Sequence, residues 1–258
     1  MTPTPTQAVI PSDPTLEIYY QGGVASSDYF NPVPANGDTF TQWKDSSASA
    51  HNANPIGGAS TRPEWYSNIQ NGLGGVLFNG TSTGLSVNPL TDLASISGET
   101  IIVVAKSLNT SSAEQYIQGG EDGNTGLNSV FIRQSGGTYN IAEGGGFAVV
   151  AGSPVDTNSH ILSVVFSGTG VNDAERLRFR IDGSDQSLAF TSSVGTTTSP
   201  LTNYIFLGVS YTSVPSGIEQ YFYSGYIFDV LVYSRALTPF ELDSVESYLS
   251  NKWNIPLV

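Results

Sequence analysis

Three arginines alternate along the segment ERLRFRID, at Arg176, Arg178 and Arg180, and supply three of the nine Lys and Arg residues in the chain. Successive side chains of a β-strand point to opposite faces, so this spacing predicts three guanidinium groups in a row on one face, about 6 to 7 Å apart. A guanidinium binds carboxylates and other anions through paired hydrogen bonds. We therefore expect an anion contact, either an acidic polysaccharide or the acidic surface of another subunit. The alternative is a solvated strand face that protects a sheet edge.

Aromatic side chains could form a platform on which sugar rings stack, and the chain has 13 Tyr, 12 Phe and 3 Trp. Trp65 and Tyr66 lie in a segment without clear hydrophobic periodicity, so they are the best candidates for an exposed pair of this kind. Packing in the core or at its rim is the alternative, because aromatic residues of a large β-rich domain are mostly buried.

Acidic residues and histidines give little support for catalysis. Hydrolysis of a glycosidic bond needs two carboxyl groups that flank it, and the nearest candidates are Glu114, Glu121 and Asp122. The surrounding run GGEDGNTG has the composition of a loop, which predicts solvated turn residues. Of the two histidines of the chain, His51 is expected to make structural hydrogen bonds, and His160 is expected to have a structural role at the edge of the strand that it opens. The sequence therefore predicts a protein that is not an enzyme.

Oxygen-bearing side chains for a calcium ion are present but widely spaced. Calcium binds about six to eight oxygens, typically with several carboxylates close together. The candidate ligands are Asp45, Glu121, Asp122, Asn124, Asp182 and Asp185. No dense Asp-x-Asp-x-Asp run joins them, and turn chemistry accounts for each. We predict no metal and no other cofactor, and leave calcium as the open alternative.

Short β-strands must position these residues. Runs such as TIIVVAKS, HILSVVFSG and YIFDVLVYS are bounded by Gly, Asn, Asp, Ser or Pro, as strands are. The continuous apolar run IIVV predicts a strand covered on both faces, whereas ERLRFRID predicts one wet face and IDGS an Asp-Gly turn. A chain of 258 residues fits one large sandwich. We expect an all-β fold of two packed antiparallel sheets.

One well-capped helix is predicted at the end of the chain. Thr238, Pro239 and Glu241 form a capping box with proline at the first helical position. Four residues then follow one apolar stripe, while the acidic and serine residues between them, Glu246 included, are expected to face water. The stripe consists of Leu242, Val245, Leu249 and Trp253. The helix should cover exposed apolar surface of the sandwich.

Several segments occur in the order seen in a known family. The segment FTQWKDSSASAHNANP contains Trp43, Asp45 and His51, and RPEWYSNIQNGLGGVLFNGTSTGLSV follows it. Together with the final strand and helix, these segments resemble the concanavalin A-like, laminin-G-like jelly-roll domains of phage structural proteins and bacterial surface proteins. The resemblance implies an all-β, two-sheet antiparallel jelly-roll sandwich over residues 16–258, with one C-terminal amphipathic helix. Hydrolases similar to this fold carry the pattern Glu-x-Asp-x-x-Glu on one strand, and no predicted strand of this chain has it.

Charge and composition bear on partners. The net charge of −13 opposes binding to nucleic acids and to anionic membranes. The chain has no Cys, no run of about 18 apolar residues, and no basic and apolar leader at its start. Residues 1–15 are rich in Thr and Pro, so we expect an extended arm that a neighbouring subunit orders.

These features lead to three functional hypotheses. The first is a non-enzymatic virion protein of a phage, assembled in the host cytoplasm as a surface decoration or a fibre- or tail-associated adhesive domain. Its partners would be other virion proteins, further copies of itself in a homo-oligomer, and a surface polysaccharide. The alternative is a lectin-like carbohydrate-binding module that recognises a cell-surface or environmental glycan. The third is a polysaccharide-cleaving enzyme.

Overall fold

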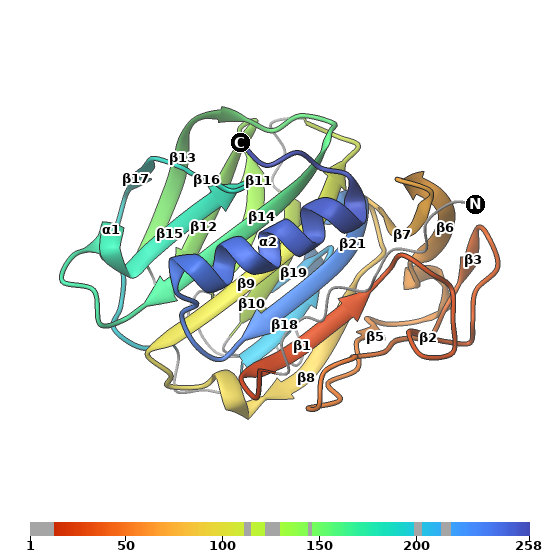
Figure 1. Cartoon of the computed structure of the whole chain (residues 1–258). Coiled ribbons are helices and arrows are strands. Elements are labelled where there is room, and N and C mark those ends of the chain that lie inside the picture. The colour runs from red at the N-terminus through yellow and green to blue at the C-terminus, as the bar shows by residue number, and fades with distance from the viewer. Residues whose placement is uncertain (1–12, 111–114, 122–129, 144–145, 199–202, 213–217) are drawn as a thin grey trace.

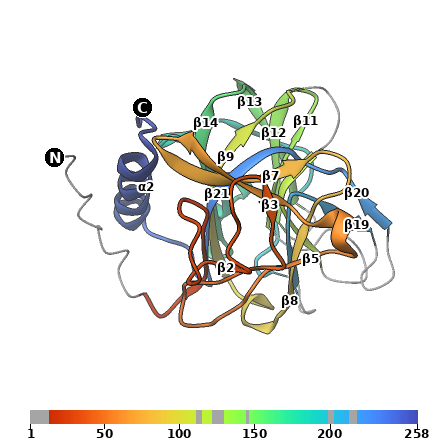
Figure 2. The ribbon, with the colours of Figure 1, turned by 90° about the vertical axis from the view of Figure 1, so that its right-hand side faces the viewer.

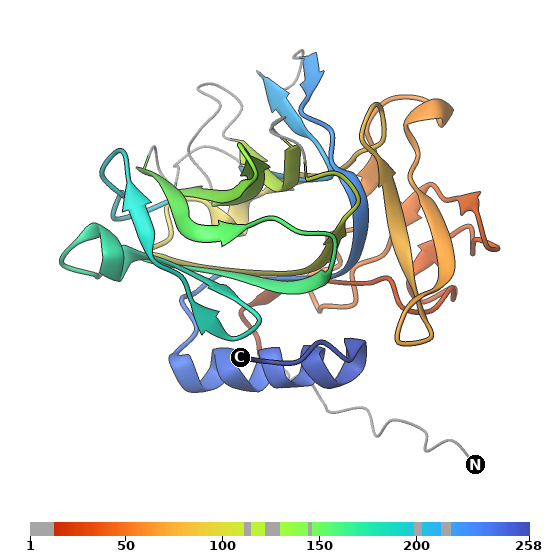
Figure 3. The ribbon, with the colours of Figure 1, turned by 90° about the horizontal axis from the view of Figure 1, so that it is seen from above.

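The computed structural model describes residues 13–110, 115–121, 130–143, 146–198, 203–212 and 218–258. Two antiparallel sheets pack face to face, and helix α2 (Pro239–Trp253) lies against the outer face of one of them (Figures 1 and 2). Viewed from above, helix and sheets form three successive layers (Figure 3). The predicted all-β sandwich with one C-terminal helix is confirmed.

The sheet under α2 is called the helix-side sheet. Its strands in spatial order are β16 (Ser184–Asp185), β15 (Leu177–Ile181), β14 (Ser159–Ser167), β9 (Gly98–Ser107), β21 (Ser224–Tyr233), β7 (Leu73–Asn79), β6 (Glu64–Gln70) and β3 (Asp38–Thr39), and β1 (Leu16–Gln21) also pairs with β21.

The second layer is called the opposite sheet. Its spatial order is β17 (Leu188–Phe190), β13 (Gly146–Pro154), β12 (Thr138–Glu143), β11 (Phe131–Ser135), β10 (Gln115–Glu121), β18 (Asn203–Leu207), β8 (Leu85–Leu90) and β5 (Asn54–Pro55). The remaining elements are the ribbons β2 (Phe30–Asn31) with β4 (Gln42–Trp43) and β19 (Ser210–Thr212) with β20 (Ile218–Gln220), and the short helices η1 (Ala59–Thr61), η2 (Thr91–Leu93) and α1 (Asp173–Arg176).

Strand β9 shows how one sequence run serves two apolar layers. Ile101 and Val103 belong to the core between the sheets, whereas Ile102 and Val104 belong to the layer under α2. All four side chains are fully buried. The prediction of a strand covered on both faces is confirmed, because alternation sends each second side chain to a different packed layer.

Helix α2 begins and docks as its sequence predicts. The Thr238 hydroxyl accepts a hydrogen bond from the Glu241 amide at 3.4 Å, and the Glu241 carboxylate accepts one from the Thr238 amide at 2.8 Å. The predicted apolar stripe packs on the helix-side sheet, with each member buried: Leu242, Val245, Leu249 and Trp253.

Glu246 departs from the prediction of a water-facing residue, because it is fully buried. Its carboxylate accepts a hydrogen bond of 2.8 Å from the Ser163 hydroxyl and lies 3.1 Å from a guanidinium nitrogen of Arg180. Burial raises the pKa of Glu246, while Ser163 and Arg180 favour its charged form. The position of Glu246 around the helix predicts only that it lies off the apolar stripe. It does not indicate that the sheet offers this side chain a buried partner.

A second buried carboxylate anchors the other end of α2. Asp229 of β21 lies 2.6 Å from the Lys252 ammonium and accepts a hydrogen bond of 3.0 Å from the Trp253 indole. The register of β21 against β9 shifts between Ile227 and Asp229, which is a β-bulge. The extra residue reorients the strand locally, and Asp229 meets the last turn of the helix.

The described end of the predicted arm contacts the domain next to α2. Asp13 forms an ion pair with Arg235, and the Thr15 hydroxyl accepts a hydrogen bond of 3.0 Å from the same guanidinium. Strand β1 begins at Leu16. Residues 1–12 lie outside the described residues, and ordering of the arm by a neighbouring subunit stays a prediction.

Removing one apolar side chain of α2 tests how far the sheet depends on this helix. Leu249→Ala should lower the free energy of unfolding by about 2 to 5 kcal/mol, because Leu249 is fully buried between helix and sheet. Ser247→Ala, an exposed position on the same helix, should change it by less than about 0.5 kcal/mol. Urea unfolding followed by circular dichroism measures both, and equal effects would contradict the docking of α2.

Candidate functional site

Arg176 does not lie on the strand where the alternation places it. Asn172 caps the short helix α1 by accepting a hydrogen bond from the Glu175 amide, and Arg176 is the last residue of this helix. Its guanidinium donates to the carbonyl oxygens of Gly170 at 2.9 Å and Val194 at 3.0 Å. The prediction of three aligned arginines is wrong for this residue, because the cap starts a helical turn just before the strand.

Arg180 does lie on β15, but its anionic partners belong to the same chain. Its guanidinium lies 2.8 Å from the Asp243 carboxylate and 3.1 Å from that of Glu246, both on α2. The side chain is only 14% exposed. Arg180 therefore fixes helix to sheet and leaves little surface for an external ligand. The solvated-face alternative is likewise wrong for Arg180.

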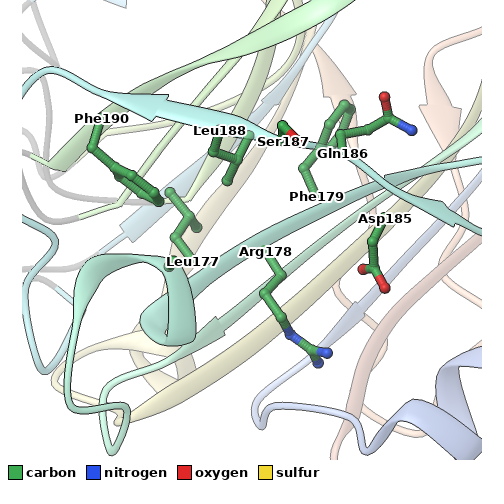
Figure 4. A pocket seen from close by; sticks show the side chains of 9 residues that line it. Leu177, Arg178, Phe179, Asp185, Gln186, Ser187, Leu188 and Phe190 are labelled. Atoms are coloured by element: carbon green, nitrogen blue, oxygen red, sulfur yellow. The ribbon is translucent and has the colours of Figure 1, made fainter.

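Arg178 is the exception among the three arginines. It is half-buried on β15, and no partner is recorded for its guanidinium in the described part of the chain. It lines a cleft at the open edge of the sandwich (Figure 4), which we call the edge cleft. The lining residues are Ala174, Leu177, Arg178, Phe179, Asp185, Gln186, Ser187, Leu188 and Phe190.

A tight hairpin and a change of sheet build the edge cleft. Asp182 and Gly183 have positive φ values of 49° and 81°, as the predicted Asp-Gly turn requires, and they connect β15 to β16. The Gln186 amide then donates to the Phe179 carbonyl at 2.9 Å. The chain next crosses to β17, which pairs with β13 of the opposite sheet. The cleft thus lies between edge strands of the two sheets.

The edge cleft combines an apolar floor with a few polar groups. Leu177 and Phe179 are buried, and Leu188 and Phe190 are partly exposed. In Figure 4, Arg178 and Asp185 extend away from these apolar side chains toward the same side. A guanidinium donates hydrogen bonds and a carboxylate accepts them, so the pair suits a ligand rich in hydroxyl groups. The edge cleft has a volume of about 270 Å³, close to the lower bound of about 300 Å³ for small-ligand pockets.

Trp65 and Tyr66 behave differently from each other. Trp65 is 8% exposed, and its indole donates a hydrogen bond of 2.7 Å to the Gly22 carbonyl. Gly74 makes room for the ring, since a Cβ atom there would lie 2.3 Å from it. The exposed-platform prediction is wrong for Trp65. Tyr66 is half-buried and donates a hydrogen bond of 2.7 Å to Glu64, and it does not line the edge cleft.

His160 is held from both sides of its ring. Its Nδ1 lies 2.6 Å from Asp182 and its Nε2 lies 2.9 Å from Asp156. Burial lowers the pKa of His160, but the two carboxylates outweigh burial and raise it above its usual value. Both ring nitrogens are engaged, so His160 has the structural role predicted for it and leaves no free nitrogen for a catalytic base.

The candidate calcium ligands that the structure describes do not converge. Asp45 accepts hydrogen bonds from the backbone amides of Tyr19, Ser47 and His51 at 2.7 to 2.8 Å, and so orders a loop. Asp182 forms a hydrogen bond with His160, and Asp185 lies in the edge cleft. These residues do not fit a calcium site. Of the other calcium candidates, Asp122 and Asn124 lie outside the described residues, and Glu121 ends β10 with a side chain that is not described. Glu114, a candidate for glycoside hydrolysis, also lies outside the described residues.

Two buried glutamates were missed by the sequence reasoning. Glu99 begins the interior face of β9 and Glu143 ends that of β12, and they are 2% and 0% exposed. Burial, together with the charge of Glu143, raises the pKa of Glu99 to about 8, and burial raises that of Glu143 to about 7. A glycosidic bond cannot reach carboxyl groups inside the sandwich, so they form no hydrolase site. In the sequence, the one sign of their burial is that each glutamate alternates with core residues along its strand.

Comparisons with known proteins agree on the fold. No protein-family model matches the chain, and no curated protein matches its sequence. Domain 4 of AbnA, a GH43 extracellular arabinanase from Geobacillus stearothermophilus solved with arabinotriose, is similar with a TM-score of 0.59 and 13% identity, covering 90% of this chain and 98% of that one. The similarity therefore spans almost the whole of this chain and almost the whole of the arabinanase domain.

Two further solved structures are also similar. A heptameric SAP-like pentraxin from Limulus polyphemus has a TM-score of 0.51 and 19% identity, over 66% of this chain and 80% of the other. The ligand-binding domain of botulinum neurotoxin serotype D, solved with N-acetylneuraminic acid, has a TM-score of 0.53 and 12% identity, over 90% of this chain and 50% of that one. At these identities the likeness establishes a jelly-roll β-sandwich and no shared activity. Among the described residues, no helix is long and apolar enough to cross a membrane.

The buried glutamates predict that stability falls as pH rises. Because their folded pKa values of about 8 and about 7 exceed the usual value of about 4.3, the folded chain holds protons that the unfolded chain releases. The free energy of unfolding should therefore decrease from about pH 5 to about pH 8. Glu99→Gln should flatten this decline, because the amide cannot ionise. Urea unfolding at several pH values measures it, and parallel profiles for the two proteins would contradict the assignment.

Proposed function

We propose that the protein is a carbohydrate-binding domain and that the edge cleft holds part of a glycan. The observation that carries the proposal is Arg178, a half-buried arginine without a recorded partner in the described chain, beside a cleft with an apolar floor. Arg178 would donate hydrogen bonds to sugar oxygens, Asp185 would accept them from sugar hydroxyls, and Phe190 would offer apolar surface to a sugar ring. The small volume suits one end or one branch of a glycan.

Two of the similar solved structures support this proposal because each was solved with a bound carbohydrate. The arabinanase domain was solved with arabinotriose and the neurotoxin domain with N-acetylneuraminic acid. Those ligands belong to those proteins, and the fold is shared by proteins of many functions. The proposal for this chain therefore depends on the chemistry of its own cleft.

We further propose that binding is not followed by cleavage. Glycoside hydrolysis needs two carboxyl groups around one bond, and the residues that line the edge cleft include one carboxylate, Asp185. The virion role and the phage origin receive no support from the comparisons and stay predictions. The homo-oligomer also stays a prediction for this chain, and its support is that the similar pentraxin is a heptamer. A glycan-binding domain is compatible with them, because an adhesive virion component also binds surface polysaccharide.

Glycan-array binding by the purified chain tests the proposal. The wild type should retain one class of glycan, and Arg178→Ala should weaken binding about 10- to 100-fold, as expected for losing a charge-assisted hydrogen bond. Phe190→Ala should also weaken it. Arg62→Ala is the matched control, since Arg62 lies outside the cleft, and it should bind like the wild type.

Two outcomes would contradict the proposal. Failure of the folded wild type to bind any glycan, or equal binding by Arg178→Ala and Arg62→Ala, would remove the edge cleft as the site. Release of reducing ends from a polysaccharide panel would overturn the non-enzymatic part. Circular dichroism of each variant controls for folding, and Arg178→Ala should keep the wild-type melting temperature because no recorded partner is lost.

A further inference from the structure

Three side chains from distant segments converge at the start of β1 and take no part in the proposed glycan site. Glu17 belongs to β1, His51 to the loop between β4 and β5, and Asp92 to η2, directly after β8. A ligand atom of each lies within 4.8 Å of the other two. Within the described ranges, this is the one such set of three His, Asp or Glu side chains. We call it the His51 cluster.

The His51 cluster contains a nitrogen that lacks its expected partner. His51 Nε2 is buried and makes no hydrogen bond, although it lies 3.5 Å from Asp92 Oδ2. Buried polar atoms are nearly always bonded to something. Zinc binds imidazole nitrogen and carboxylate oxygen at about 2.0 to 2.2 Å, so two ligands at a tetrahedral angle lie about 3.3 to 3.6 Å apart. The separation of His51 and Asp92 equals one edge of such a tetrahedron.

The surrounding groups orient these ligands. The two oxygens of Glu17 accept hydrogen bonds from Ser234 at 2.8 Å and from Ser49 at 2.9 Å. The His51 amide donates to Asp45 at 2.8 Å, which fixes the loop that carries the ring. Such outer hydrogen bonds are typical of metal sites, where they hold ligands in position. The Asp92 side chain is 55% exposed, so an ion and a bound water can enter.

We propose that the His51 cluster binds a divalent transition-metal ion of the zinc type, with His51 Nε2 and the carboxylates of Glu17 and Asp92 as protein ligands. One imidazole and two carboxylates suit zinc and fit calcium poorly, because calcium takes oxygen ligands. The ion would join β1, the loop after β4 and the segment after β8. Binding to the folded chain alone would then stabilise it.

Titration calorimetry and thermal unfolding after chelator treatment test the site with zinc chloride as the probe. The wild type should bind one zinc ion per chain and melt at a higher temperature with zinc, whereas calcium chloride should have no effect. Ser49→Ala should weaken binding about 10-fold, as loss of an outer hydrogen bond does. His51→Gln and Asp92→Asn should each weaken it more.

His160→Gln is the matched control, since His160 is the other histidine of the chain and lies outside the cluster. It should keep the zinc-induced shift, as should Arg178→Ala of the edge cleft. Absence of zinc binding by the wild type, or equal affinity in wild type and His51→Gln, would overturn the proposal. If His51→Gln does not fold, Asp92→Asn decides, because Asp92 is exposed and has no recorded partner other than His51.

Discussion

The docking of α2 on the helix-side sheet is the constraint on which the rest of the molecule depends. Its apolar stripe covers one face of the sheet, and carboxylates buried at this interface, Glu246 and Asp229, each meet a cation, Arg180 and Lys252. A buried carboxylate without a partner costs several kcal/mol, so the helix cannot slide along the sheet without breaking these pairs. Apolar packing supplies the stabilisation, and the ion pairs fix the position.

This docking also determines which arginine is left for a ligand. Arg180 pairs with a carboxylate of α2, and Arg176 donates hydrogen bonds to backbone carbonyl oxygens. Arg178 alone of the three remains beside the open edge of the sandwich, where the chain leaves one sheet for the other. The edge cleft is thus a consequence of topology, because edge strands from two sheets meet there and a short crossing segment forms part of its wall.

Trp43, Asp45 and His51, which carry part of the family resemblance, order one loop, and the same loop leads to the His51 cluster. Trp43 is fully buried and donates a hydrogen bond to the Gln21 carbonyl at 3.1 Å. Asp45 gathers three backbone amides and so determines the path of the loop up to His51. The same hydrogen bonds that order the loop direct the His51 ring toward Glu17 and Asp92. A loop motif and a metal site can therefore share residues without competing for them.

The amino-acid sequence by itself determined the doubly covered strand β9, the Asp-Gly hairpin and the capped helix, because these follow from side-chain alternation and backbone geometry within a few residues. It also indicated the β-sandwich, through its many strand-like runs and the family resemblance. Only the tertiary structure decided the burial of Trp65, Glu246, Glu99 and Glu143, and the different partners of the three arginines. Alternation tells which side chains share a face, but not what packs on that face. The His51 cluster joins segments distant in sequence, so it depends on the order in which the strands are placed in the sheets. The edge cleft is lined by one run, residues 174–190, and this run forms a cleft because its strands β15 and β17 pair with different sheets.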